Sequence, residues 1–257
     1  MNNEGGNNIL SDITGLTKFT VRVIHHLLNP PFENREMFKQ SYNIGYKTLP
    51  LIAITAFILG LVLTLQSRPV LVDFGAETLL PGMISVSIVR EIGPVVTALI
   101  CAGKIGSGIG AELGSMKVTE QIDAMEVSGT NPMKFLVATR VLATTLMLPI
   151  LVFFADFISF IGSFIAVNLH SDISVQLFLT DAFAPLHFYD IIPATIKSFM
   201  FGFAIGVIGC YKGYQAGFGT EAVGRAANSA VVVASVAIFV IDMLVVELQH
   251  SMELLKF

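Results

Sequence analysis

The stretch TLPLIAITAFILGLVLTL, residues 48–65, indicates the fold class of this protein, because none of its side chains is charged. A helix needs about 20 mostly apolar residues to cross the hydrocarbon core of a bilayer. Four further apolar stretches, at residues 80–103, 135–167, 191–211 and 226–247, repeat this pattern with one or two charges in each. The longest of them would measure about 50 Å as a helix, so it must tilt, bend near Pro149 or project from the membrane. The sequence therefore predicts an all-α integral membrane protein with five transmembrane helices.

The composition supports this class and excludes others. Of the 257 residues, 54% are hydrophobic and only 13% are charged, whereas soluble domains carry about 25% charged residues. The formal net charge of −4, without a basic block, argues against a nucleic-acid-binding protein. Cys101 and Cys210 both lie in apolar stretches, so they are expected to be small buried side chains without a redox role.

The positions of the basic residues predict the orientation of the chain. Loops with an excess of Lys and Arg stay in the cytoplasm. Only Arg68 and Lys256 fall on one side of the predicted spans, and eleven basic residues fall on the other. We therefore expect a cytoplasmic N-terminus and a C-terminus outside. The eleven are Lys18, Arg22, Arg35, Lys39, Lys47, Lys104, Lys117, Lys134, Arg140, Lys212 and Arg225.

Residues 1–47 form a separate region before the first span. Apolar residues recur here near helical spacing, with Lys18 and Arg22 between them. This pattern predicts an amphipathic helix that lies on the cytoplasmic leaflet and ends at Asn29-Pro30-Pro31. The alternative is a loosely bound tail. The apolar residues are Ile9, Ile13, Leu16, Val23 and Leu27.

Several charged residues lie inside the predicted spans, where each costs about 2.5–3.5 kcal/mol on insertion scales. Counted from the ends of their spans, Arg90, Glu91, Lys197 and Asp242 all fall in the outer half of the bilayer, and Asp156 lies near the middle. Adjacent residues on a helix do not face each other, so Arg90 and Glu91 need partners elsewhere, and Lys197 and Asp242 have suitable signs. We expect a polar cluster that opens outward. The alternative is a set of salt bridges that only holds the spans together.

Glycines at four-residue spacing predict close helix contacts. They are Gly202/Gly206, Gly209/Gly213/Gly217 and Gly106/Gly110/Gly114. Because ordinary packing produces most such matches, they do not define a dimer face.

The predicted cytoplasmic loop, residues 104–134, carries a second pattern. Residues 117–127 read as a short amphipathic helix, with Ile122 and Met125 on one side and an acidic face on the other. Gly129 and Pro132 are expected to end it. Such a helix suits docking to a soluble partner, and the alternative is a solvated loop. The acidic face consists of Glu120, Asp123 and Glu126.

The sequence resembles the MlaE/YrbE permeases, the membrane subunits of Mce-type ABC lipid transporters. The resemblance covers about residues 40–250 and rests on four motifs. They are Arg90-Glu91-Ile92-Gly93-Pro94-Val95, Ala111-Glu112-Leu113-Gly114-Ser115-Met116, Thr119-Glu120-Gln121-Ile122-Asp123-Ala124-Met125 and Asn131-Pro132. Thr64-Leu65-Gln66 and Ala76-Glu77 also fit.

The resemblance implies a five-span permease domain at residues 48–257 that forms a homodimer in the bacterial inner membrane. It further implies two cytoplasmic ABC ATPase subunits, a hexameric MCE-domain protein on the periplasmic side and, in some systems, a STAS-domain protein. Phospholipid would be the substrate. ATP and Mg would bind to the ATPases, since this chain has no G-x-x-x-x-G-K-[ST] motif. No cofactor, metal or catalytic residue is expected on the chain itself.

The resemblance also assigns candidate residues. A coupling helix at about residues 112–128 would contact the ATPases through Glu112, Glu120, Gln121, Asp123 and Met125. An outward-open lipid cavity would be lined by Leu63, Val70, Leu71 and Phe74, with Arg90, Glu91, Lys197 and Asp242 as its charged positions. Arg68-Pro69 departs from the family pattern and is expected to add a charge and a rigid turn at the cavity rim.

Two other functions remain open from the residues. One is an ion- or proton-coupled secondary transporter of an amphipathic substrate, although this would leave the docking loop unexplained. The other is an intramembrane lipid-modifying enzyme that uses Glu91, Asp156 or Asp242 as acid–base groups. No histidine lies in a predicted span near these carboxyl groups, which argues against the enzyme.

Overall fold

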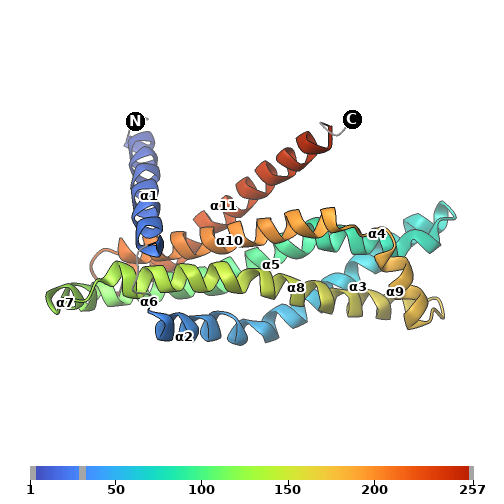
Figure 1. Cartoon of the computed structure of the whole chain (residues 1–257), viewed down its shortest axis with the longest axis horizontal. Coiled ribbons are helices and arrows are strands. Elements are labelled where there is room, and N and C mark those ends of the chain that lie inside the picture. Colours follow the sequence, from blue (N-terminus) through green and yellow to red (C-terminus); the bar gives the residue numbers. More distant parts are fainter. Residues whose placement is uncertain (1–3, 29–32, 255–257) are drawn as a thin grey trace. The chain divides into compact units, whose positions relative to one another are not determined.

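The structure is a computed structural model that describes residues 4–28 and 33–254, with side chains from 12–28 and 33–251. Every regular element within those ranges is a helix (Figure 1). Five helical segments are long and apolar enough to cross a membrane, at 34–73, 77–118, 133–168, 188–214 and 220–251. The predicted all-α fold with five spans is therefore confirmed.

The helices follow one another with few residues between them. The α-helices are α1 Glu4–Leu28, α2 Asn34–Ile44, α3 Leu49–Asp73, α4 Leu80–Ser87, α5 Gly93–Cys101, α6 Ser107–Val118, α7 Gln121–Val127, α8 Thr139–Asn168, α9 Val175–Phe183, α10 Phe188–Tyr214 and α11 Thr220–Leu254. The short 3₁₀ segments are η1 Tyr46–Thr48 and η2 Glu77–Leu79, and the π-helical segments are η3 Ile88–Ile92, η4 Ala102–Gly106 and η5 Met133–Ala138.

Pro69 and Pro149, like Pro193 of α10, lie inside long helices. The turn expected at Arg68-Pro69 was a wrong prediction, because α3 continues through Pro69 to Asp73 and ends before Gly75, whose φ is 66°. Likewise α8 is one continuous helix across Pro149. Membrane helices tolerate proline because neighbouring groups satisfy the freed backbone. Neither proline therefore serves as an end signal here.

The segment expected to be a loop at residues 104–134 is mostly helical, which corrects the predicted boundary. Residues 104–118 continue the second span as η4 and α6, since Ile105, Ile109 and Leu113 are buried at helical spacing. The helix breaks at Glu120, whose φ of 58° is left-handed, and α7 follows. Gly129, with φ of 82°, then ends this region as expected.

The chain divides into two compact units. The second unit comprises Gly45–Ile100, Met147–Phe201 and Ile238–Phe257. In this unit α3 and α8 pack closely, because a Cβ at Gly60 or Gly162 would collide with the backbone of the facing helix. The Thr64 hydroxyl donates to Ser163 Oγ at 2.8 Å. The unit's core cluster consists of Leu80, Ile84, Ile88, Val167, Phe178 and Ala182.

The first unit comprises Met1–Ile44, Cys101–Leu146 and Gly202–Ala237. Here the glycine spacing predicts the contact correctly: a Cβ at Gly213 would lie 2.9 Å from the carbonyl oxygen of Gly110, and one at Gly209 would lie 3.2 Å from that of Gly106. Gly217 faces open space instead. Small residues thus let α10 approach η4 and α6 closely.

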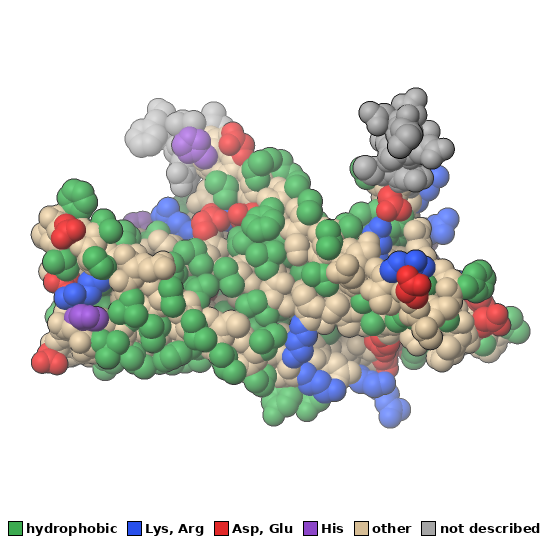
Figure 2. Space-filling view, turned by 180° about the vertical axis from the view of Figure 1, so that it is seen from behind, with side chains coloured by type: hydrophobic (Ala, Val, Ile, Leu, Met, Phe, Trp, Pro, Cys, Tyr) green, Lys and Arg blue, Asp and Glu red, His purple; other side chains and the backbone are tan. Residues whose placement is uncertain are grey.

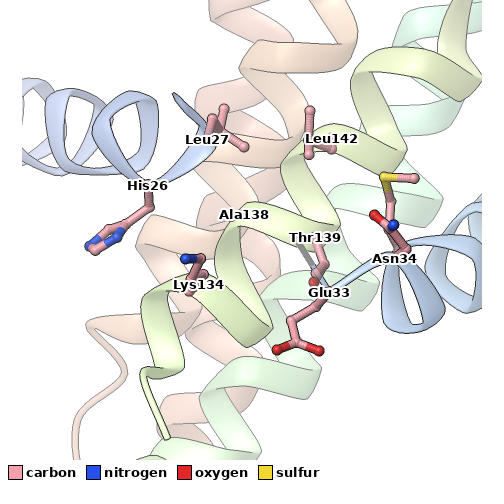
Figure 3. Close-up of a pocket in the computed structure, with 9 residues that line it drawn as sticks. His26, Leu27, Glu33, Asn34, Lys134, Ala138, Thr139 and Leu142 are labelled. Carbon is pink, nitrogen blue, oxygen red and sulfur yellow. The ribbon is translucent and has the colours of Figure 1, made fainter. Parts of the chain in front are cut away.

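The N-terminal helix α1 belongs to the first unit and confirms the predicted helix. Asp12 binds Lys212 at 2.8 Å, and Val23 is buried. The C-terminal end of α1 lies near η5, and His26 and Lys134 line a small cavity of about 20 Å³ there (Figure 3). The expected stop at Asn29-Pro30-Pro31 lies outside the described residues.

Large hydrophobic side chains remain exposed on several spans. Ile54 of α3, Phe157 of α8 and Val236 of α11 are 62%, 62% and 59% exposed. Figure 2 shows hydrophobic side chains over much of the visible face. Such surface suits contact with lipid or with another apolar partner.

Candidate functional site

Lys197 is the centre of a charged cluster in the second unit. Its side chain is fully buried in α10. The Nζ atom lies 2.6 Å from Glu91 Oε1 and 2.9 Å from Asp242 Oδ1, and it also donates to the carbonyl oxygen of Arg90 at 3.3 Å. Three spans therefore meet at one ammonium group. The expected pairing of Glu91 with Lys197 is present, and Asp242 binds the same cation, which was not expected.

The local backbone explains how Glu91 reaches this cation. Arg90 and Glu91 lie in the π-helical turn η3, closed by a hydrogen bond from the Gly93 amide to the Ile88 carbonyl. A π-turn inserts one extra residue into an α-helix and changes the direction of the side chains around it, and such turns are frequent at functional sites. The turn therefore redirects two adjacent charges in the middle of an apolar span.

Asp156 packs beside this turn rather than within the cluster. Its carboxyl group fills the space that a side chain at Gly93 would occupy. The group is buried, and its Oδ1 atom has no hydrogen-bond partner among the described residues. A glycine is therefore required at position 93, because the Asp156 carboxyl group approaches its backbone closely.

Arg90 has a different partner from the one expected. Its Nη2 atom lies 2.6 Å from Oδ1 of Asp190, which is only 4% exposed. Asp190 Oδ2 also accepts from the His187 amide at 2.8 Å. Pairing Arg90 with Asp242 was therefore wrong. The available signal was that Asp190 is an acidic residue in the first turn of α10, a position favoured for carboxylates.

The complete cluster carries an excess of negative charge. With every group ionised, Arg90 and Lys197 face three carboxylates, those of Glu91, Asp190 and Asp242, which leaves one net negative charge. The cluster is open at Arg90 and Glu91, whose side chains are 44% and 42% exposed. Asp242 Oδ1 is at ion-pair distance from Lys197 but has no well-oriented hydrogen bond. The cluster can therefore accept a further donor or cation and also offer Arg90 to an anion.

The expected apolar cavity residues divide into two pairs. Leu63 and Leu71 pack against the core of the second unit. Val70 and Phe74 are 54% and 82% exposed. Arg68 is held by Glu77 at 2.7 Å. Val70 and Phe74 are therefore available for contact with a ligand. Leu63 and Leu71 are less available, because both pack against the core.

The five residues expected to contact an ATPase also differ in their surroundings. Glu112 binds the buried Arg140 at 2.8 Å, and Asp123 binds Lys117 at 2.8 Å. Glu120 and Gln121 are exposed, and Met125 is half-buried. All four polar residues of this set are exposed, and among the described residues Glu112 and Asp123 form ion pairs whereas Glu120 and Gln121 form none.

Among the described residues, no group of three or more His, Cys, Asp or Glu side chains is placed to hold a metal ion. The charged cluster of the second unit is exposed at Arg90 and Glu91, which can take part in electrostatic contacts.

Comparison with known proteins defines the family. Residues 37–248 match the family model described as permease MlaE, so the chain belongs to the MlaE permease family. It is 38% identical over 230 residues to a Rickettsia typhi protein named "Probable ABC transporter permease protein", covering 90% of this chain and 89% of the relative. A Synechocystis protein with the same description is 35% identical over 86% of this chain and 84% of the relative.

A plant relative is also similar. The Arabidopsis thaliana protein named "Protein TRIGALACTOSYLDIACYLGLYCEROL 1, chloroplastic" is 32% identical over 86% of this chain and 63% of its own length. Together, the family and the names of the relatives identify the chain as a membrane permease subunit, a component of a transporter.

Proposed function

We propose that this chain is the permease subunit of an ABC transporter that moves phospholipids between the bacterial inner membrane and a periplasmic MCE-domain partner. ATP hydrolysis would occur on two separate cytoplasmic ATPase subunits, which bind ATP and Mg. The permease itself would hold the lipid and change conformation, with no catalytic residue of its own. In this proposal the transporter contributes to the lipid asymmetry of the outer membrane.

The observation that carries the proposal is the buried Lys197 held between Glu91 and Asp242. Charges in membrane helices are rare and usually serve substrate or ion pathways. Arg90 is exposed enough to bind a lipid phosphate, and Glu91 or Asp242 can accept from an amine or hydroxyl of the head group. Val70 and Phe74 would then contact acyl chains.

A lipid is the substrate class that fits these features best. The site combines both signs of charge with exposed apolar residues, and a phospholipid has the same two parts. The name of the Arabidopsis relative is that of a glycolipid, which is consistent with a lipid-related role in the family. MCE-domain and STAS-domain partners are part of the proposal through the family resemblance.

Coupling to ATP hydrolysis would use α6, α7 and the turn between them. Glu120, Gln121 and Met125 would contact the ATPase, with Asp123 contributing at the rim of this surface. The ion pairs Glu112–Arg140 and Lys117–Asp123 would hold the segment in place while force passes through it. Reversal of charge at Glu120 and Asp123 should uncouple ATP hydrolysis without unfolding the permease.

A homodimer is the assembly that we propose for the permease. In the most apolar window of the span ending in α3 only 28% of residues are buried, and in that of α11 only 17%, against 50% in each of the other three. These two helices therefore have the largest unburied apolar surfaces. A second copy could cover them, and cross-linking of cysteines placed on α11 would test this.

The decisive experiment is lipid transfer by the reconstituted complex after replacing Lys197 with Met and Asp242 with Leu together. Loss of ATP-dependent transfer of a fluorescent phospholipid, with normal assembly, is expected. The matched control is Arg225→Gln, because Arg225 forms an ion pair in which both side chains are highly exposed. Unchanged transfer in the double variant would reduce the cluster to a packing element.

The buried carboxyl group of Asp156, whose Oδ1 atom has no hydrogen-bond partner among the described residues, favours one second candidate, a proton-coupled secondary transporter. Vesicles that carry either ATP or a proton gradient separate the two functions. Transfer that follows the proton gradient without ATP would favour the secondary transporter and contradict the ABC proposal.

A further inference from the structure

A polar pocket, separate from the cluster around Lys197, lies in the first unit, where α1 approaches α7, η5 and the end of α10. Its volume is about 390 Å³. None of its residues belongs to the cluster around Lys197, and the proposed lipid transport does not use it. The lining residues are Gly15, Lys18, Phe19, Arg22, Glu126, Met133, Tyr211, Tyr214 and Gln215.

The pocket is built by specific contacts between α1 and α10. The ring of Phe19 packs edge-on against Tyr211, with centroids 5.5 Å apart, and lies 6.1 Å from Tyr214. The Tyr211 hydroxyl donates to the Asp12 carbonyl oxygen at 3.2 Å. Lys212 binds the Asp12 carboxylate at 2.8 Å. These contacts hold one wall of the pocket against the other.

The two walls carry opposite charge. Lys18 and Arg22 are four residues apart on α1 and therefore neighbours on its surface. In the described part of the chain, neither has a carboxylate partner. On the α7 side, Glu126 lines the pocket with Tyr214, and its carboxylate can accept hydrogen bonds from a ligand. The pocket thus presents two unpaired cations and one carboxylate.

The pocket also borders a surface suited to a membrane interface. Ile13, Val21, Ile24 and Leu28 of α1 are between 43% and 74% exposed, which is the pattern of an interfacial amphipathic helix. Lys18 and Val21 are three residues apart and adjacent on the helix surface. A lipid in the neighbouring leaflet could therefore place its chains on the apolar face of α1 and its head group in the pocket.

We propose that this pocket binds the zwitterionic phosphoethanolamine head group of a membrane lipid, with the phosphate on Lys18 and Arg22 and the ammonium on Glu126. Charge-assisted hydrogen bonds to phosphate and carboxylate are the strong class. A phosphatidylglycerol supplies the phosphate without the ammonium, and a phosphatidylcholine supplies a cation without N–H donors. The bound lipid would bridge α1 and α7.

The test places a photocrosslinking benzoylphenylalanine at Gln215, on the pocket wall, in the full-length permease with its co-purified partners. The complex is reconstituted in nanodiscs of phosphatidylethanolamine, phosphatidylglycerol and phosphatidylcholine in equal amounts, and the crosslinked lipid is identified by mass spectrometry. We expect phosphatidylethanolamine to be enriched about tenfold over the others, which corresponds to one charge-assisted hydrogen bond. The same crosslinker at Arg35 of α2 is the control for local lipid composition.

Variants assign the head-group contacts. Lys18→Gln with Arg22→Gln should lower crosslinking to phosphatidylethanolamine about tenfold or more, whereas Lys18→Arg should retain it. Glu126→Gln should remove the preference over phosphatidylglycerol while lipid is still captured. The matched control Arg35→Gln removes one positive charge outside the pocket and should change nothing.

Three outcomes would overturn the proposal. Equal capture of the three lipids by the unaltered chain is one, and unchanged capture after loss of Lys18 and Arg22 is another. In the third, millimolar glycerophosphoethanolamine abolishes the crosslink, which would identify a soluble phosphate compound as the ligand. Failure to displace the lipid with this soluble head group supports the membrane source.

Discussion

Arg140 in the first unit and Lys197 in the second are the cations buried among the described residues, and their partners differ. Arg140 makes two hydrogen bonds to the single carboxylate of Glu112, which is 52% exposed. Lys197 lies between two carboxylates from different spans, and Arg90 with Asp190 completes its cluster. The first arrangement is a closed neutral pair. The second has an excess carboxylate and exposed members.

The difference suggests separate roles for the two cations. A bidentate Arg–carboxylate pair has fixed geometry and leaves little binding capacity, so it suits a structural contact. A cluster with unequal charge, in which Asp242 Oδ1 has no hydrogen-bond partner among the described residues, can take up a further donor or cation. This contrast supports Lys197 as part of a binding site, and the following experiments would break or sharpen it.

The largest effect is expected from Lys197→Met. This change leaves Glu91 and Asp242 without their cation, and breaking a buried pair costs about 3–5 kcal/mol. The lower end applies here because Glu91 is partly exposed. Thermal unfolding in detergent should show a clear loss of stability, and addition of Asp242→Leu should recover part of it. Equal stability of the single variant and the wild type would contradict a closely coupled cluster.

Arg140→Met should have a smaller effect, about 1–2 kcal/mol, because water can solvate the half-exposed Glu112 once its partner is lost. Adding Glu112→Gln should bring the stability close to that of the wild type. Thermal unfolding of both variants beside Lys197→Met measures the contrast directly. A greater loss at Arg140 than at Lys197 would reverse the comparison.

Asp190→Asn should affect transport more than stability. Arg90 is 44% exposed, so loss of its partner should cost no more than about 1 kcal/mol. The released guanidinium would no longer be held in position for a phosphate, and lipid transfer should fall severalfold. Lipid-transfer assays and thermal unfolding on the same preparation compare the effect on transport with the effect on stability. Loss of stability without loss of transfer would assign Asp190 a packing role.

The smallest effect is expected at His26, which lines the small cavity between α1 and η5. Its pKa is lowered from 6.5 by burial, and the charges of His25 and Lys134 act in the same direction. Because protons bind less well in the folded state, the contribution of His26 to the docking of α1 is present above pH 6.5 and is lost as the pH falls through the lowered pKa. Glu33 also lines this cavity (Figure 3) and would partly offset the added charge.

Hydrogen exchange of α1 between pH 7.5 and 5 provides the measurement for His26. After correction for the slower intrinsic exchange at low pH, exchange of the α1 amides should increase at low pH in the wild type and less so in His26→Asn. The same increase in both would assign the pH response to another group.

Several elements of the site could be predicted from residue positions. Depth along each apolar stretch placed Glu91, Lys197 and Asp242 at similar levels, and opposite signs then indicated contact. The partner of Arg90 could not be found this way, because Asp190 lies at the start of α10 and its approach depends on how the helices pack. The position of the Asp156 carboxyl group depends on the lack of a side chain at Gly93 in another helix. The π-turn η3 likewise has no simple sequence signal.

The amino-acid sequence by itself determined the class of protein and the number of spans, because a bilayer requires long apolar helices whatever their neighbours are. It also determined the family through motifs at fixed positions. Only the tertiary structure decided where α3 and the second span end, which carboxylate each cation meets, and that Lys18, Arg22 and Glu126 border one pocket. These features depend on side chains from distant segments, whose distances follow from packing and cannot be read from spacing along the chain.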